Sequence, residues 1–426
     1  MNKRDNSLVT PRIRKARIAT FAGFMMVGAM MYIWSTGVSA FREQMGLSGS
    51  LGDADFGLIA LGIGIGAAAG SLFVGRFIDI FGSKRVIYTT AVIYPLSIIP
   101  LGFVTGFWFA LVFGVILGVF RGAIDTALNT HGVQVERFYR RPIMSAFHAF
   151  YSLGGFLLGM VGSLFATRFT DSAAVPFTVL GVAMLVIGCL IGHFMLNKDD
   201  VPELAEPAAP HAVPVAAPSS GSNWQIIMLM IGFGVLLLGG MLGESSVADW
   251  GQEYVRRELG TSISLAGMAV SVFIGAECLG RLVGDRIAER VGSPQMVFGS
   301  GILAVCGLLL TMIGGTATSG LIGFGLFGLG LACIAPLMLS SAGRKDPANA
   351  GRNIGIVNGI GYSGMLLGPA AISTVVNYFG IGYVLYTPLV LLVPLALFGP
   401  LLMRFHTTST TDKEAVGSFA PHQSVR

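Results

Sequence analysis

Long apolar runs separated by short polar stretches dominate the pattern of hydrophobic and polar positions along the chain. A run of about 18 or more apolar residues is long enough to cross the hydrocarbon core of a bilayer as a helix. The runs lie near residues 17–40, 55–75, 85–104, 107–135, 142–167, 173–196, 224–247, 262–283, 294–314, 318–343, 352–379 and 382–404. The pattern therefore predicts an all-α membrane protein with twelve transmembrane helices.

The stretch between the sixth and seventh runs differs from both neighbours. It contains five prolines and no apolar helical face, so it predicts a linker between two groups of six helices. We expect a cytoplasmic N-terminal tail (1–16), a first six-helix bundle (17–196), a cytoplasmic linker (197–223), a second six-helix bundle (224–404) and a cytoplasmic C-terminal tail (405–426).

The distribution of positive charge orients these helices. If both termini are cytoplasmic, 22 of the 27 Lys and Arg residues fall on the cytoplasmic side, four fall on the other side, and Arg121 remains within a helix. Cytoplasmic loops of membrane proteins carry an excess of Lys and Arg. The split therefore predicts a multi-pass protein of the bacterial inner membrane with both termini in the cytoplasm.

The composition excludes an ordinary soluble enzyme. Hydrophobic residues make up 53% of the chain, and charged residues only 12%, about half the usual share in soluble proteins. The net charge of +5 comes from basic residues between apolar runs, so it does not indicate nucleic-acid binding. The sequence contains no phosphate-binding loop, hydrolase motif or metal-ligand cluster. We expect no enzymatic activity, no cofactor and no bound metal.

An internal repeat relates the two groups of helices. Sliding the sequence by 210 residues aligns six positions around the loops after the second and eighth runs, and five of these pairs are identical. The aligned pairs are Gly57 with Gly267, Gly70 with Gly280, Arg76 with Arg286, Asp79 with Glu289, Gly82 with Gly292, and Ser83 with Ser293. Two equivalent bundles in the same orientation are typical of transporters with a binding site at their interface.

The loop after the second run, GRFIDIFGSKR (75–85), resembles the signature of the major facilitator superfamily. Ile80 and Ser83 depart from that signature, where basic residues are usual. The matching positions are Gly75, Asp79, Gly82, Lys84 and Arg85. The resemblance implies the twelve-helix fold of that superfamily and transport by alternating access.

Three further segments resemble a bacterial branch of the superfamily that is related to the fucose permeases. They are GAIDTALN (122–129), MSAFHAFYSLGG (144–155), and the Glu244, Asp249 and Trp250 group. The resemblance implies that Asp125 corresponds to the protonatable carboxylate of the fucose permeases.

Charged residues inside the bilayer are costly and therefore mark candidate sites. Arg121, Asp125 and Asn129 recur every four residues, which places them on one face of a helix and brings Arg121 within reach of Asp125. We interpret Asp125 as the residue that binds and releases the coupling proton, with Arg121 as its charged neighbour. The alternative is a self-neutralised pair with only a structural role.

The fifth run carries a polar stripe that includes His148 and Tyr151. His148 and Asn129 lie at similar distances from the cytoplasmic ends of their runs, so the two side chains can meet. His148 is then either a donor to a solute hydroxyl or a packing residue.

The seventh run ends with Glu244, Asp249 and Trp250. Carboxylates and an aromatic face suit a sugar or polyol, whereas simple anchoring at the membrane interface is the alternative. Glu244 is also a candidate for proton coupling. Further candidates for contact with the solute are Tyr32, Trp34, Asn358 and Tyr362. Glu277 lies in mid-helix with Arg281 four residues later, and we interpret this pair as structural.

The loop at 75–85 and its copy at 285–292 are candidate cytoplasmic gates. Their acidic residues can accept hydrogen bonds from helix N-termini of the opposite bundle, or pair with basic neighbours. Simple orientation by positive charge is the alternative. The gate candidates are Gly75, Asp79, Gly82, Lys84, Arg85, Asp285, Arg286, Glu289 and Gly292.

The sequence thus predicts a monomeric secondary transporter whose partners are a small-molecule substrate, protons and the lipid bilayer. Proton-coupled uptake of a sugar, polyol or similar small polar solute is the leading interpretation. Proton-coupled efflux of drugs or metabolites and a non-transporting membrane sensor or scaffold remain alternatives.

Overall fold

The computed structural model describes residues 9–47, 49–197, 200, 224–261 and 263–405, which form helices joined by short turns. The first group contains α1 (Pro11–Gln44), α2 (Gly49–Phe81), α3 (Ser83–Ile98), α4 (Phe107–Tyr139), α5 (Met144–Arg168) and α6 (Ala174–Phe194). The second contains α7 (Trp224–Arg257), α8 (Ile263–Val291), α9 (Ser293–Gly314), α10 (Ala317–Leu331), α11 (Ile334–Lys345), α12 (Ala350–Phe379) and α13 (Tyr386–Arg404).

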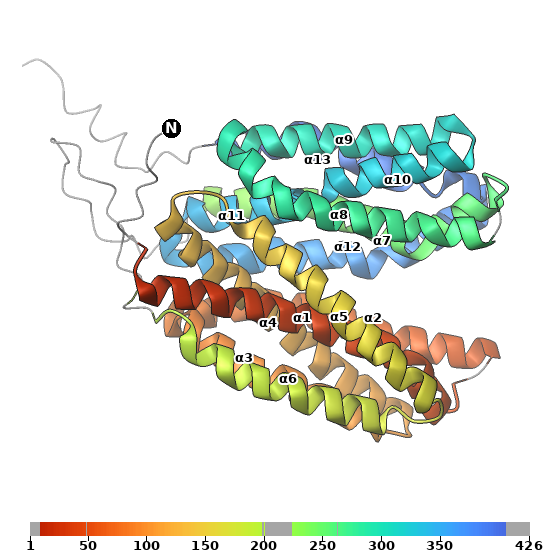
Figure 1. Ribbon diagram of the computed structural model, residues 1–426, viewed down its shortest axis with the longest axis horizontal. Coiled ribbons are helices and arrows are strands. Elements are labelled where there is room, and N and C mark those ends of the chain that lie inside the picture. Colours follow the sequence, from red (N-terminus) through yellow and green to blue (C-terminus); the bar gives the residue numbers. More distant parts are fainter. Residues whose placement is uncertain (1–8, 48, 198–199, 201–223, 262, 406–426) are drawn as a thin grey trace, which may run out of the picture.

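The helices lie along the long axis of the molecule in two layers. Figure 1 shows α1 to α6 in the lower layer and α7 to α13 in the upper one, with α5 crossing the face between them. We call the end where α1 begins and α6 ends the linker end, and the opposite end the far end. The all-helical class expected from the sequence is confirmed.

Ten helical segments of the described chain are long and apolar enough to cross a membrane. Helices α8 and α12, which correspond to the apolar runs expected at 262–283 and 352–379, include side chains outside the described part of the structure and are not among these ten. The span expected at 318–343 is present as Ala317–Lys345, and its helix is interrupted at residues 332–333, which divides it into α10 and α11. The first helix also begins at Pro11, inside the stretch expected to be a tail, because Thr10 accepts from Ile13 N–H and caps it.

The repeat detected in the sequence is visible in the backbone. Gly82 precedes α3 with φ of 82°, and Gly292 precedes α9 with φ of 90°. Both conformations are strained for residues with a Cβ atom, so glycine permits the tight turn at the same place in each half.

Close helix packing depends on glycine at two kinds of interface. Within the first half, a Cβ atom at Gly154 of α5 would lie 2.0 Å from the carbonyl oxygen of Met25 on α1. Between the halves, a Cβ at Gly355 of α12 would lie 2.6 Å from the carbonyl oxygen of Ser71 on α2. The backbones therefore approach closely at both places, as is common where membrane helices pack through small residues.

Candidate functional site

Asp125 lies at the centre of the molecule and connects its two halves. Asp125 lies on α4 and is only 8% exposed. Its Oδ2 accepts from Asn129 Nδ2 on the same helix at 3.1 Å and from Asn358 Nδ2 on α12 at 2.7 Å. The Tyr362 side chain, also on α12, lies close to this carboxyl group. Asn129, predicted on the same helix face as Asp125, and Asn358, predicted as a solute contact, therefore meet at one carboxylate.

Arg121 does not form the contact with Asp125 that the sequence predicted. Its Nη2 lies 3.4 Å from Met31 Sδ, and its guanidinium carbon lies 5.9 Å from the centre of the Tyr362 ring. Among the described residues, no ion pair within 4.0 Å involves Arg121. The amides of Asn129 and Asn358 satisfy the carboxylate instead, so the guanidinium is free to lie on the aromatic ring.

His148 and Tyr151 lie beside this carboxylate on α5. His148 Nε2 is 3.1 Å from Asn129 Oδ1, so the contact expected between these two residues is present. The hydroxyl of Tyr151 donates to Met31 Sδ at 2.8 Å, beside Arg121. Tyr32 of α1 packs along α5, where a Cβ at Gly155 would lie 2.6 Å from its ring. These side chains are half-buried, apart from the fully buried Asn129.

Glu277 and Arg281 form a second charged group, on α8. Arg281 Nη2 lies 2.5 Å from Glu277 Oε1, and Arg281 Nη1 donates to Ser152 Oγ of α5 at 2.7 Å. The intrahelical pairing agrees with the sequence interpretation. The contact with Ser152 adds a second link between the halves that the sequence did not indicate.

The described candidates at the end of α7, and Trp34 of α1, have separate surroundings. Glu244 is half-buried, and it lies close enough to Tyr32 and Arg281 for its charge to act on both. The Asp249 side chain lies outside the described part of the structure. Trp250 is half-buried and packs against the apolar core. Trp34 stacks on Phe177 of α6 within the first half, with ring centres 5.9 Å apart, away from Asp125.

At the linker end, carboxylates of each half cap helices of the opposite half. Asp79 Oδ1 accepts from Gly351 N–H at 2.8 Å and its Oδ2 from Arg352 N–H at 2.9 Å, at the start of α12. This is the type of contact that the sequence predicted for Asp79. Helix N-termini favour such contacts because their first N–H groups lack partners within the helix.

The equivalent contact in the second half uses Asp285. Its two oxygens accept from Ser145 N–H at 3.0 Å and from Ala146 N–H at 2.8 Å, in the first turn of α5. Glu289, which the 210-residue repeat aligns with Asp79, pairs instead with Arg141 at 3.6 Å. The capping carboxylate of α8 therefore lies one helical turn earlier than the repeat predicts.

A third acidic residue at this end, Glu136, was missed by sequence reasoning. It is 2% exposed, at the end of α4, and accepts from the backbone N–H groups of Ile143 and Met144. In the second half it contacts the Ser340 hydroxyl and lies 3.8 Å from Arg344. The only available signal was the charged stretch ERFYRR at 136–141, which the sequence analysis used for orientation alone.

The remaining gate candidates have other surroundings. Gly75 packs against the start of α12, where a Cβ would lie 2.6 Å from Gly351 O. Lys84 is half-buried, and Arg85 and Arg286 are exposed. Gly82 and Gly292 form the turns described above. The structure places these residues at the linker end without bringing Lys84, Arg85 or Arg286 into an interface between the halves.

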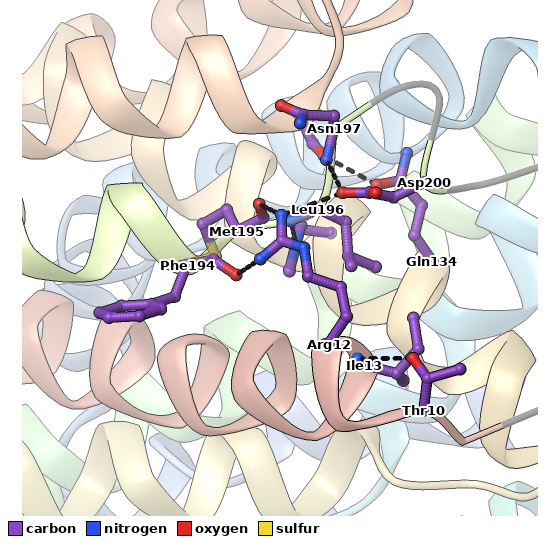
Figure 2. Close-up of polar contacts among 11 residues, drawn as sticks. Thr10, Arg12, Ile13, Gln134, Phe194, Met195, Leu196, Asn197 and Asp200 are labelled. Carbon is purple, nitrogen blue, oxygen red and sulfur yellow. Dashed lines mark hydrogen bonds and ion pairs between the residues drawn. The ribbon is translucent and has the colours of Figure 1, made fainter.

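Arg12 forms a cluster at the linker end that the sequence did not indicate (Figure 2). Its guanidinium donates to the carbonyls of Phe194 and Met195 at 2.8 and 2.6 Å, and to Asp200 Oδ2 at 2.9 Å. Asn197 N–H also donates to Asp200 Oδ2, at 2.9 Å. Burial acts to raise the pKa of Asp200, but these hydrogen bonds outweigh it and hold the pKa below its usual value. Arg12 thus ties α1 to the C-terminus of α6.

An apolar groove lies elsewhere, on the first half. It has a volume of about 590 Å³ and is lined almost entirely by apolar side chains of α2, α3 and α4, with Arg85 at its edge. None of the residues around Asp125 lines it, so it does not form part of the central site.

Comparison with known proteins agrees with this arrangement. The sequence profile of the Major Facilitator Superfamily matches residues 18–368 and 226–425. The chain belongs to the Major Facilitator Superfamily. This superfamily member is 32% identical over 351 residues to the uncharacterised transporter y4wD of Sinorhizobium fredii. The aligned region covers 82% of this chain and 88% of that protein. It is 30% identical over 361 residues to an uncharacterised transporter of Yersinia pestis, covering 84% of this chain and 88% of that protein.

The fold of this superfamily member is similar to that of the E. coli fucose–proton symporter FucP. Against FucP in its outward conformation, the TM-score is 0.73, with 15% sequence identity over 95% of this chain and 100% of that one. The likeness concerns the fold, because the sequence identity is low.

Proposed function

We propose that this superfamily member is a secondary transporter that works by alternating access and couples uptake of a small polar solute, such as a sugar or polyol, to a proton. Asp125 is the proton carrier. The observation that carries the proposal is the hydrogen bond of 2.7 Å from Asn358 to Asp125, which joins the two halves at a buried carboxylate. A proton that binds there acts directly on a contact that must change when the halves move.

The hydrogen bonds of Asp125 explain how protonation is coupled to movement of the halves. The ionised carboxylate accepts from the amide groups of Asn129 and Asn358. Once Asp125 is protonated, the oxygen that still accepts from Asn358 is a carbonyl and no longer a carboxylate oxygen, so the contact with Asn358 loses its charge assistance and weakens. Protonation therefore favours a new arrangement of the two halves. Arg121 lies near enough to influence this step by its charge, and Glu244, which acts on Arg281, is the second candidate for proton coupling.

The solute site in this proposal is the set of half-buried polar groups around Asp125. The phenols of Tyr32, Tyr151 and Tyr362 and the imidazole of His148 can donate to or accept from hydroxyl groups. Asn129 and Asn358 complete the set. Trp250 and Asp249 lie nearer the far end of α7, where they contribute to entry of the solute.

The carboxylates at the linker end act as the gate. In the proposed cycle Asp79, Asp285 and Glu136 hold this end closed while the solute enters from the far end. Each would release its partners in the opposite half when the linker end opens. The similarity in fold to FucP in its outward conformation supports this assignment, and the positive-inside distribution of Lys and Arg supports a linker end in the cytoplasm of a bacterial inner membrane.

The same proposal includes the domain organisation expected from the sequence. Two six-helix bundles, 17–196 and 224–404, move relative to each other about the central site, and a monomer suffices because both halves come from one chain.

Asp125→Asn tests the assignment of the proton carrier, since Asn has the same shape and cannot ionise. We expect the purified variant to fold and bind solute, while solute uptake into proteoliposomes no longer responds to an imposed pH gradient. Asp171→Asn, at an exposed position between α5 and α6, is the matched control and should transport normally. Normal proton-driven uptake by Asp125→Asn would refute the assignment. Proton-driven export by the wild-type protein would instead establish an antiporter.

A further inference from the structure

Arg121 and Glu244 carry opposite charges, and neither forms an ion pair within 4.0 Å with any residue that the structure describes. Among the described residues, the only hydrogen-bond acceptor within reach of Arg121 is Met31 Sδ at 3.4 Å. Glu244 forms no hydrogen bond or ion pair with any residue that the structure describes. Unpaired charges are rare inside membrane helices because their desolvation is not compensated. Both side chains are half-buried, so each can reach a solute.

The two charges lie on opposite halves, at similar distances from the far ends of their own helices. Arg121 comes 14 residues after α4 begins at Phe107, and Glu244 comes 13 residues before α7 ends at Arg257. At 1.5 Å per residue, both lie about 20 Å from the far ends of their helices. Tyr151 lies close enough to both for each charge to act on its phenol.

The other charges of the central region already have partners. Glu277 and Arg281 neutralise each other at 2.5 Å, and Asp125 accepts from two amides. Within the described part of this region, Arg121 and Glu244 lack such a direct contact, one on each half.

We propose that the transported solute is a zwitterion, whose acidic group binds Arg121 and whose protonated amine binds Glu244. This inference rests on the proposed function and specifies its solute as a small polyhydroxy compound that carries both a carboxylate and an amine. A neutral solute leaves both protein charges unpaired. A simple anion or cation pairs with one of them and leaves the other unpaired.

Such a solute also accounts for proton coupling. With Asp125 protonated, the five ionisable groups of the central region carry no net charge, and a zwitterion keeps the occupied site neutral. Its carboxylate also cancels the field of Arg121 at Asp125, which favours the protonated form of Asp125. Solute and proton therefore stabilise each other's binding.

Four compounds with one carbon skeleton test the inference: D-glucose, D-gluconate, D-glucosamine and D-glucosaminate. Binding to the purified full-length protein is measured by calorimetry at about pH 6, where amines are protonated and carboxylates ionised. We expect D-glucosaminate to bind about 10- to 100-fold more tightly than D-gluconate or D-glucosamine, since each charge-assisted contact contributes on that scale. D-glucose should bind most weakly.

Arg121→Gln and Glu244→Gln then identify the partner of each group. Arg121→Gln should weaken binding of the two acids and spare D-glucosamine, whereas Glu244→Gln should weaken binding of the two amines and spare D-gluconate. If either variant fails to fold, Arg121→Lys and Glu244→Asp keep the charges and should keep the ranking of the four compounds.

Three results would overturn the inference: D-glucose binding as tightly as D-glucosaminate, equal weakening of all four compounds by each Gln variant, or no binding by any of the four. Failure of the proposed function is a different result. If D-glucosaminate binds in the expected pattern but no pH gradient drives its uptake, the binding site stands and proton coupling does not. If D-glucose alone binds and its uptake depends on Asp125, the proposed function stands and the zwitterion does not.

Discussion

Asp285→Asn should open the linker end of this transporter, whereas Glu289→Gln should leave it nearly unchanged. Asp285 accepts two backbone hydrogen bonds from α5, at 3.0 and 2.8 Å, and is 8% exposed. Asn keeps one acceptor oxygen, loses the charge, and turns an N–H group toward a backbone donor. A hydrogen bond to a charged group contributes about 1.5–3 kcal/mol.

The expected loss for Asp285→Asn is therefore about 2–3 kcal/mol, which shifts the equilibrium toward the open linker end by about 30- to 150-fold. Glu289 has a side chain that is 33% exposed, and its ion pair with Arg141 spans 3.6 Å. Such exposed pairs contribute about 0–1 kcal/mol, so Glu289→Gln should shift the equilibrium about fivefold at most.

Spin labels on the exposed linker-end positions Arg76 of α2 and Arg290 of α8 would measure the separation of the halves. The four native cysteines are replaced first, and distance distributions are compared among the parent, Asp285→Asn and Glu289→Gln. A longer distance in Asp285→Asn alone is expected. A larger shift in Glu289→Gln would mean that the sequence repeat, and not the observed hydrogen bonds, identifies the gate.

Two further predictions concern packing and the Arg12 cluster. Gly154→Val should lower the free energy of unfolding of the purified protein by about 2 kcal/mol or more, because a Cβ atom at this position would lie 2.0 Å from the Met25 carbonyl oxygen. Gly299→Ala is the control, because a Cβ atom there has no other atom within 4 Å, and it should be neutral or slightly stabilising. Since the pKa of Asp200 is held below 3.8, its contact with Arg12 should persist above that pH and be lost as the pH falls through the lowered value, seen as faster hydrogen exchange at Asn197 N–H. If Arg12→Gln leaves the hydrogen-exchange rate of Asn197 N–H unchanged, the second prediction is wrong.

Much of the fold could be predicted from the sequence because the bilayer imposes simple rules. Backbone groups in hydrocarbon must be paired within a helix, so each long apolar run becomes a helix whatever its neighbours are. The exceptions have local causes. The expected tenth helix divides into α10 and α11, and the run at 17–40 extends back to Pro11 because Thr10 caps the helix there.

The central site was only partly predictable, because helical spacing reports neighbours on one helix and not contacts between helices. Spacing placed Asp125 and Asn129 on one face, and they do form a hydrogen bond. The same spacing suggested Arg121 as the partner of Asp125. Asn358 takes that place from a helix 233 residues away in the chain, which no local pattern indicates.

The gate shows the same division between sequence and structure. The repeat located both turns through Gly82 and Gly292, because a positive φ restricts those positions to glycine in each half. It could not show that Asp285, and not Glu289, caps the opposite helix, because a carboxylate one turn away on α8 can reach the same N–H groups. Local periodicity and turn chemistry thus determined the helices, their repeat and the candidate residues, whereas the approach of the two halves decided which of those residues meet.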